Sequence, residues 1–140
     1  MLPDTNVVSE AMKPPPVSAV MDWLREQPMH QLTMSAVTVA EIRYGLARLP
    51  QGSRRLELEE RFHIFVMRGF SDRVLPCDQA TADVYGDLVA HRESVGEPIG
   101  AFDAMIAATA RIVEAQIATR DIGGFKDYGL ELINPSEHRR

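Results

Sequence analysis

Short apolar segments alternate along the chain with longer stretches in which apolar residues recur every three or four positions. The longer stretches have the period of helices with one buried face, and the short segments are typical of buried strands. Helices are predicted from the turn and cap at residues 4–6 through Met12, at 17–27, from Thr38 to about Leu49, at 53–69, from 79 to about 94, and at 101–115. Strands are predicted at residues 2–3, 31–35, 73–76 (a buried strand), 116–119 and 130–133. Strands that alternate with helices predict an α/β fold, a three-layer α/β/α arrangement with a central parallel sheet.

Polar residues and helix breakers mark the ends of these elements. Asp4 precedes the first helix in a turn that suits a helix cap, and the prolines at 14–16 are expected to end that helix. Thr38 and Glu41 have the spacing of a capping box. Two consecutive glycines at 123–124 predict a loop after Asp121.

The size and composition of the chain suit one compact domain, which we expect to span residues 1–140. The chain has 140 residues, of which 45% are hydrophobic. Cys77 is the only cysteine, so an internal disulfide and a thiolate zinc site are excluded and a cytoplasmic location is expected. No apolar stretch approaches the roughly 20 residues of a membrane span. We therefore expect no membrane association.

The net charge of −5 is the opposite of what a general nucleic-acid binder carries. If several acids gather around a bound divalent cation, however, the local charge is reversed and a phosphate backbone is attracted. An acidic surface also suits a basic protein partner. The charge therefore leaves nucleic-acid chemistry open and makes a metal ion central to it.

Four acidic residues occupy positions from which a parallel sheet can present functional side chains. Asp4 and Asp121 directly follow predicted strands, and the carboxyl ends of strands are where ligands bind in such sheets. Asp103 lies in a helix of small apolar residues, where an unpaired carboxylate would be costly to bury. Each acid also has a structural interpretation: Asp4 or Asp103 can cap a helix, Glu41 can complete the capping box, and Asp121 can be a turn residue.

If these four side chains converge, they form an all-oxygen site of the kind that suits Mg²⁺ or Mn²⁺. Such an ion polarises a phosphate and lowers the pKa of a bound water. The chain lacks a glycine-rich dinucleotide turn, a phosphate-binding loop and a His-Glu-x-x-His motif. Its histidines are scattered, which disfavours zinc. The predicted chemistry is hydrolysis of a phosphate ester by metal-activated water.

Four sequence segments, in this order, resemble the PIN-domain ribonucleases, specifically the VapC-type toxins of bacterial toxin–antitoxin pairs and their FitB-like branch. The segments are DTNVVSE at 4–10, SAVTVAEIRYG at 35–45, DAMIAATA at 103–110 and ATRD at 118–121. Each segment alone is weakly diagnostic, but together they extend over essentially the whole chain. The resemblance implies a PIN-like α/β/α fold.

The resemblance also implies roles for individual residues. By position in the motifs, Asp4, Glu41, Asp103 and Asp121 match the acidic metal site. Two polar residues match those that support and orient this site: Asn6 and Thr119. Proteins of this family are Mg²⁺- or Mn²⁺-dependent endoribonucleases that arrest growth and pair as homodimers. A cognate antitoxin blocks the site, commonly with an arginine, and provides the contact with operator DNA.

The sequence departs from the family pattern at two positions next to the predicted site. Pro3 replaces the usual apolar residue before Asp4 and removes a backbone donor from a central strand, so this strand is expected to be short or distorted. Gly124 stands where the pattern often has a polar or acidic residue, so a secondary ligand from that loop is not expected. The four main acids are unaffected.

Two other functions are compatible with parts of this pattern. A PIN-like domain without turnover would bind RNA or a partner and not cleave. An Asp-based phosphatase or phosphotransfer domain shares the layer architecture and also has an acid after the first strand, but it would have a further acid close to Asp4, where this chain has Asn6. RNA cleavage that depends on Mg²⁺ separates the ribonuclease from both.

Overall fold

The computed structural model describes residues 1–12, 18–126 and 129–137. The helices are α1 Thr5–Met12, α2 Ser18–Glu26, α3 Ala36–Ala47, α4 Ser53–Gly69, α5 Gln79–Ser94, α6 Ala101–Ile112 and the short α7 Ile122–Phe125, with 3-10 helices η1 Met29–Gln31 and η2 Pro135–Glu137. The strands are β1 Leu2–Pro3, β2 Met34–Ser35, β3 Val74–Leu75, β4 Ile117–Ala118 and β5 Leu132–Ile133. The proline run at 14–16 and the predicted first residue of the second helix lie outside the described residues.

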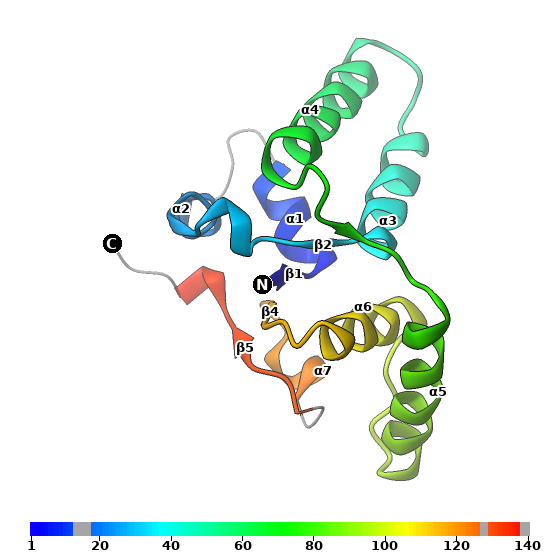
Figure 1. Cartoon of the computed structure of the whole chain (residues 1–140). Coiled ribbons are helices and arrows are strands. Elements are labelled where there is room, and N and C mark those ends of the chain that lie inside the picture. The colour runs from blue at the N-terminus through cyan, green and yellow to red at the C-terminus, as the bar shows by residue number, and fades with distance from the viewer. Residues whose placement is uncertain (13–17, 127–128, 138–140) are drawn as a thin grey trace.

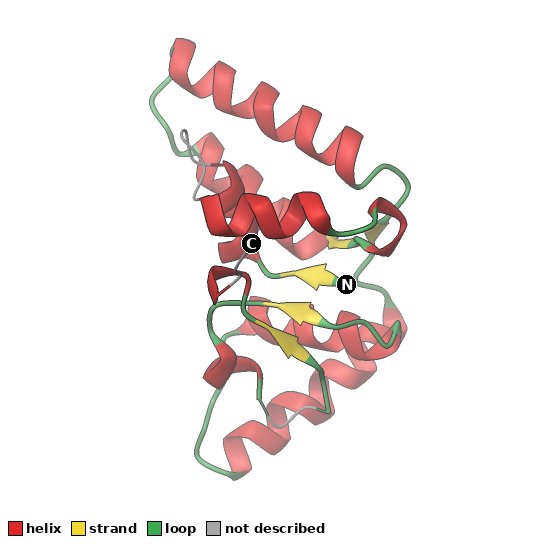
Figure 2. Ribbon diagram, turned by 90° about the vertical axis from the view of Figure 1, so that its left-hand side faces the viewer, coloured by secondary structure: helices red, strands yellow, loops and turns green. Residues whose placement is uncertain are grey.

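The strands are all parallel and form two neighbouring groups, β1-β4-β5 and β2-β3. The backbone of Thr33, just before β2, donates to the carbonyl of Met1, so β2 lies beside β1 and the spatial order is β3-β2-β1-β4-β5 (Figure 2). The chain reverses direction across the sheet between β1 and β4. In open parallel sheets, this switch point is where ligands bind.

Pro3 explains why the sheet is divided. The amides of Leu2 and Asp4 donate, at 2.7 and 2.9 Å, to the carbonyls of Gln116, just before β4, and of Ala118 within it. The amide position of the residue between them therefore faces the opposite side, toward β2. A proline has no N–H to donate there. The pairing of β1 with β4, which carries the predicted site, is therefore intact, and the ladder between β1 and β2 is the part that is interrupted.

Helices cover both faces of the sheet, as predicted, and each face has its own apolar cluster (Figure 1, Figure 2). On one face, α1, α2 and α4 bury side chains that include Val7, Trp23 and Phe62. On the other face, α5 and α6 pack along each other over Leu2 and Ile117. The α/β fold with a central parallel sheet is thus confirmed. In the described part of the chain, no helix is long and apolar enough to cross a membrane.

Several predicted elements are corrected by the structure. The stretch at 123–124 is helical, not a loop, and belongs to α7. The strand at 73–76 is shorter and not buried, because β3 is the edge strand and Val74 is 37% exposed. The predicted strand at 31–35 begins only at Met34, since the carbonyl of Pro28 accepts from Gln31 and closes the turn of η1.

Helix α6 ends before the predicted boundary at residue 115. Glu114 has a φ of 54°, in the left-handed region, and the amide of Ala115 donates to the carbonyl of Ala110 at 2.9 Å. This pair is the signature of a Schellman turn, which ends a helix and redirects the chain. The turn sends the chain from α6 directly into β4.

Candidate functional site

Asp4 lies at the carboxyl end of β1, at the switch point of the sheet, and only 3% of it is exposed. Its Oδ1 accepts a hydrogen bond of 2.9 Å from the amide of Val7, so it does cap α1 as the structural interpretation predicts. Its Oδ2 accepts a hydrogen bond of 2.6 Å from the hydroxyl of Thr119. Asp4 is thus a helix cap and also joins β1 to the end of β4.

Thr119 and Asp121 extend this arrangement from β4. The hydroxyl of Thr119, which donates to Asp4, also accepts from the amide of Asp121 at 2.9 Å. Oδ1 of Asp121 accepts from the amide of Gly124 at 3.0 Å and so caps α7. Thr119 is fully buried, whereas Asp121 is exposed to solvent. One buried hydroxyl therefore connects two of the predicted site residues.

Gly124 has a positional role that the sequence did not reveal. A Cβ built on Gly124 would lie 2.8 Å from Cγ of Asp121, well inside contact distance, whereas a Cβ on neighbouring Gly123 would meet nothing within 4 Å. The glycine permits the Asp121 carboxylate to fold back onto the start of α7. The departure from the family pattern at this position therefore goes with a closely packed Asp121.

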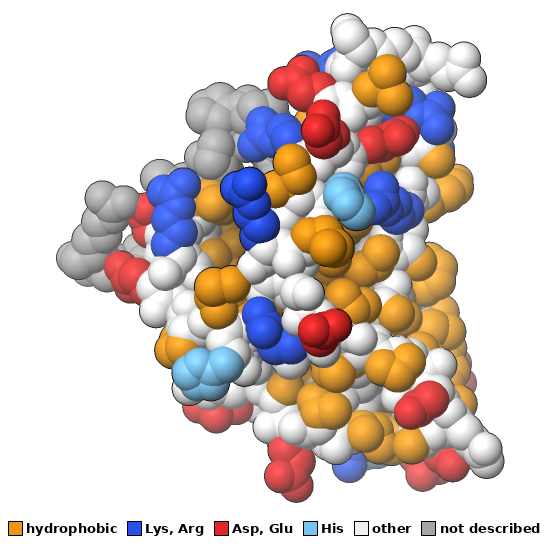
Figure 3. Space-filling view, turned by 45° about the horizontal axis from the view of Figure 1, so that its top comes forward, with side chains coloured by type: hydrophobic (Ala, Val, Ile, Leu, Met, Phe, Trp, Pro, Cys, Tyr) orange, Lys and Arg blue, Asp and Glu red, His pale blue; other side chains and the backbone are white. Residues whose placement is uncertain are grey.

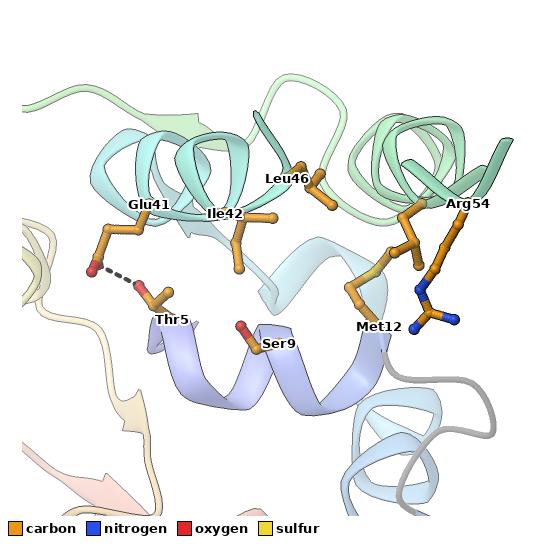
Figure 4. Close-up of a pocket in the computed structure, with 9 residues that line it drawn as sticks. Thr5, Ser9, Met12, Glu41, Ile42, Leu46 and Arg54 are labelled. Carbon is orange, nitrogen blue, oxygen red and sulfur yellow. Dashed lines mark hydrogen bonds between the residues drawn. The ribbon is translucent and has the colours of Figure 1, made fainter. Parts of the chain in front are cut away.

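The capping-box interpretation of Glu41 is wrong. The hydroxyl of Ser35 caps α3 by accepting from the amide of Val37 at 3.1 Å, and Thr38 lies inside the helix. Glu41 is then in the middle of α3, where no cap is needed. Its Oε1 accepts a hydrogen bond of 2.7 Å from the hydroxyl of Thr5 (Figure 4). A contact between α1 and α3 thus directs Glu41 toward the carboxyl end of β1.

Asp103 differs from the other three acids in having no hydrogen bond or ion pair with the described residues. It lies in the first turn of α6 and is partly buried. The N-cap residue of this helix is Gly100, which has no side chain to bond with Asp103. Burial and then the charges of Asp4, Glu41 and Asp121 raise the pKa of Asp103 above its ordinary value. The carboxylate therefore stands in a field of like charges without a compensating cation.

The same electrostatic coupling affects Asp4. Burial is the largest cause that raises the pKa of Asp4; the hydrogen bonds from Thr119 and Val7 lower it, and the charges of Asp121 and Glu41 raise it further. No guanidinium or ammonium group is among the causes of the shift for Asp4 or Asp103. The four acids that the sequence singled out are thus brought into one region and repel one another.

The donor set fits a hard divalent cation, since all four groups are carboxylates and Asp103 is available to bind. Across residues 1–12, 18–126 and 129–137, however, no three acidic, histidine or cysteine side chains stand close enough together to hold an ion as they are placed. Glu41 and Asp121 each accept a hydrogen bond with one carboxylate oxygen, from the hydroxyl of Thr5 and the amide of Gly124 respectively.

Two hollows flank α1 beside the acids. One, of about 340 Å³, extends along α1, α3 and α4 from Glu41 to Arg54 over the apolar side chains of Ile42 and Leu46 (Figure 4). The other, of about 410 Å³, is polar and is lined by Asn6, Ser9, Glu10, Arg120 and Asp121. Asn6, predicted to support the site, is exposed and borders this second hollow, without a hydrogen bond to any of the four acids.

Other acids near strand ends do not join the cluster. Asp78 follows β3 and accepts hydrogen bonds from the amide and the hydroxyl of Thr81, at 3.1 and 3.2 Å, so it is a cap for α5. Sequence analysis also missed Thr5, whose hydroxyl reaches Glu41 and, at 3.2 Å, Thr38. Its position next to Asp4 is the signal that could have drawn attention to it.

Comparisons with known proteins point to one family. The model of the PIN domain matches residues 1–130. The VapC ribonuclease Y4jK of Sinorhizobium fredii is 43% identical over 134 residues, which cover 96% of each protein. Toxin FitB of Neisseria gonorrhoeae is 37% identical, over 96% of this chain and 97% of its own. The crystal structure of FitAcB from Neisseria gonorrhoeae superposes with a TM-score of 0.89, over 97% of this chain and 98% of that one.

Proposed function

Since the chain belongs to the PIN-domain family, among its VapC-type toxins, we propose that it is an Mg²⁺- or Mn²⁺-dependent endoribonuclease and the toxin of a toxin–antitoxin pair. The proposed metal ligands are Asp4, Glu41, Asp103 and Asp121. The ribonuclease activity is supported by the relative named a VapC ribonuclease. The relation to that protein extends over nearly the full length of both chains. We propose that residues 1–140 act as one PIN domain, in the cytoplasm.

The observation that carries the metal-site proposal is the partly buried carboxylate of Asp103, without a hydrogen bond or ion pair among the described residues and within the field of three other carboxylates. A divalent cation would remove the repulsion and use the oxygen atoms that Asp103 offers. When bound, the ion would polarise the scissile phosphate and lower the pKa of a water molecule.

The residues of this chain would hold the site in order. Thr119 and the amide of Val7 fix both oxygen atoms of Asp4, so the orientation of this carboxylate is set before a ligand arrives. The hydroxyl of Thr5 holds Glu41 at 2.7 Å from the opposite side. Hydrogen bonds of this kind orient metal ligands and strongly affect metal affinity.

The partners that we propose are a cognate antitoxin, an RNA substrate and a second copy of the chain. The solved FitAcB structure, 37% identical to this chain, supports a protein partner. An arginine of the antitoxin would pair with the carboxylate cluster in place of the metal ion. Contact with operator DNA would be made by the antitoxin.

A homodimer is supported by apolar side chains that face solvent. Tyr44 on α3 is 65% exposed and Phe102 on α6 is 55% exposed, and these two helices contact each other. Hydrophobic side chains also gather along the right-hand side of the face in Figure 3, the side on which α3 and α5 lie in Figure 1. Contiguous exposed apolar surface of this kind is typical of protein interfaces.

Aspartyl phosphotransfer is a weaker explanation. Both oxygen atoms of Asp4 accept hydrogen bonds, and the residue is only 3% exposed, so it is poorly placed to attack a phosphate as a nucleophile. A PIN-like domain without turnover would keep the acids for binding alone. The experiment below separates this possibility from the ribonuclease.

The direct test incubates the purified chain with RNA and Mg²⁺ or Mn²⁺, with and without EDTA. We expect cleavage that stops with EDTA and in Asp103→Asn. The matched control is Asp87→Asn, which removes one negative charge from an exposed position on α5 and should cleave like the parent. RNA binding without cleavage under these conditions would favour the silent domain. In cells, induced expression should arrest growth, and Asp4→Ala should relieve the arrest.

A further inference from the structure

Arg120 lies between two predicted site residues in sequence, Thr119 and Asp121, yet its guanidinium pairs with Glu10 and not with an acid of the cluster. Its Nη1 is 3.0 Å from Oε1 of Glu10, near the end of α1. The side chain of Arg120 is 51% exposed, whereas that of Glu10 is 14% exposed. The glutamate is therefore the more firmly enclosed half of this pair, and the guanidinium is the half that can exchange partners in solvent.

The pair forms one wall of the polar hollow of about 410 Å³, which Asp121 also borders. Every residue that lines it is polar or charged, so it is not an apolar docking groove. Ser9 lines this hollow and also the hollow of about 340 Å³ that reaches Glu41. The two hollows thus share Ser9 of α1, and each is lined by one of the four acids, Glu41 in the first and Asp121 in the second.

An RNA strand that reaches this cluster faces an electrostatic problem. The chain has a net charge of −5, and the acids that would bind the metal ion repel every phosphate beyond the one that the ion contacts. A guanidinium next to the metal site would compensate a neighbouring phosphate, and its planar geometry suits phosphate oxygens. In the hollow beside Asp121, Arg120 is placed to do this.

We infer that Arg120 binds an RNA phosphate adjacent to the one that is cut, and that this phosphate replaces Glu10 as its partner. The inference rests on the proposed ribonuclease function and adds a residue that binds the substrate. While RNA is absent, Glu10 holds the guanidinium over the hollow and keeps it from pairing with Asp121. The site is thereby left free to bind its cation.

A purely structural role is the alternative, in which the ion pair ties the segment after β4 to α1. The two roles predict opposite results for Glu10→Gln. If Arg120 binds phosphate, releasing it from Glu10 strengthens RNA binding. If the pair only positions Asp121, Glu10→Gln weakens activity in the same direction as Arg120→Gln.

The experiment measures binding of a short single-stranded RNA with Ca²⁺ in place of Mg²⁺ over a series of salt concentrations, and cleavage with Mg²⁺ on the same RNA. Electrophoresis checks that the RNA stays intact in Ca²⁺. Arg120→Gln should weaken binding about tenfold, raise KM in proportion and change kcat by less than about twofold. The slope of log K against log salt should become shallower by about 0.7, the value for one phosphate contact on a single strand.

Two further variants and a control complete the test. Arg120→Lys should keep the parent's slope of log K against log salt. Glu10→Gln should tighten RNA binding about twofold in the parent background, and it should have no effect on RNA binding when Arg120→Gln is already present. Arg25→Gln removes an arginine that lines a different hollow and should leave the slope unchanged. Thermal melting checks that each variant is folded.

An unchanged slope in Arg120→Gln, or weaker binding in Glu10→Gln, would overturn the inference. If Glu10→Gln tightens RNA binding even in the Arg120→Gln background, the effect is a general one of charge, and this result would also overturn the inference. If the parent protein fails to cleave RNA in Mg²⁺, the proposed function fails, but the salt dependence measured in Ca²⁺ still decides whether Arg120 contacts phosphate.

Discussion

Asp4 and Asp78 occupy similar local positions and have different surroundings. Asp4 directly follows β1, Asp78 comes three residues after the end of β3, and each caps the helix that comes next. Asp78 follows the edge strand β3, and among the described residues its carboxylate accepts hydrogen bonds only from Thr81, three residues away. Asp4 follows the central strand β1, and its second oxygen accepts from Thr119, 115 positions along the chain. The difference teaches that an acid after a central strand can contact a neighbouring strand, whereas an acid after an edge strand stays within its own helix cap.

The largest expected effect comes from making the same substitution at both positions. Asp4→Asn should lower kcat for RNA cleavage by more than about a hundredfold. Mutation of a residue that only orients a metal ligand already lowers activity or metal affinity about 10- to 100-fold. The Asp78→Asn variant should cleave RNA at a rate within about twofold of the parent's, since asparagine caps a helix as well as aspartate does. Initial rates on a common RNA measure both. Similar losses in the two variants would show that capping, and not a metal site, explains the role of Asp4.

A smaller effect is expected from the two adjacent glycines of α7. Gly124→Ala places a Cβ against the Asp121 carboxylate and should weaken Mn²⁺ binding and raise the metal concentration needed for cleavage by about tenfold. Gly123→Ala has free space at its Cβ and serves as the matched control. Activity measured over a range of Mn²⁺ concentrations gives both values. Equal behaviour of the two variants would mean that the position of Asp121 is not important for metal binding.

The smallest effect concerns stability and has the opposite sign from the effect on activity. Because burial and three nearby carboxylates raise the pKa of Asp103, the folded state binds more protons than the unfolded state, and stability falls as the pH rises above the ordinary carboxyl value of 3.8. Asp103→Asn removes this penalty. Solvent screens the partly exposed group, so we expect a gain of about 1 kcal/mol at neutral pH.

Thermal melting in EDTA measures this gain, which corresponds to a Tm about 4 °C higher for a domain of this size. The difference between variant and parent should shrink as the pH falls toward the ordinary carboxyl value of 3.8 and vanish below it, where Asp103 is protonated in both states. At one Mn²⁺ concentration, the metal should raise the Tm of the parent by more than it raises that of Asp103→Asn. A variant that melts below the parent in EDTA would show that Asp103 is not repelled by its neighbours.

The sequence predicted the helices and the sheet well because their signals are local. The period of apolar residues located α4 and α5 within their observed bounds, and strand-helix alternation gave the parallel sheet. Contacts between distant elements gave no such signal. The spacing of Thr38 and Glu41 suggested a capping box, whereas Ser35 caps the helix and Glu41 is held by Thr5 from α1. The exposure of β3 likewise depends on its place at the edge of the sheet.

The four acids were identified partly from their positions and partly from the family resemblance, and their proximity could not be read from the sequence. Asp103 was the strongest candidate on physical grounds, because an apolar helix is a costly place for an unpaired carboxylate. The structure supports that reasoning, as this acid has no hydrogen bond or ion pair among the described residues. The consequence of Pro3 also required the structure, since only the register shows that its missing donor faces β2.

A calorimetric titration with Mn²⁺ tests the central claim, that the four acids at the switch point form a metal site. The parent protein and Asp87→Asn should bind Mn²⁺ with the same affinity, and Asp103→Asn should bind it more than about tenfold more weakly. Absence of Mn²⁺ binding in the parent, or equal affinity in the parent and Asp103→Asn, would contradict the claim.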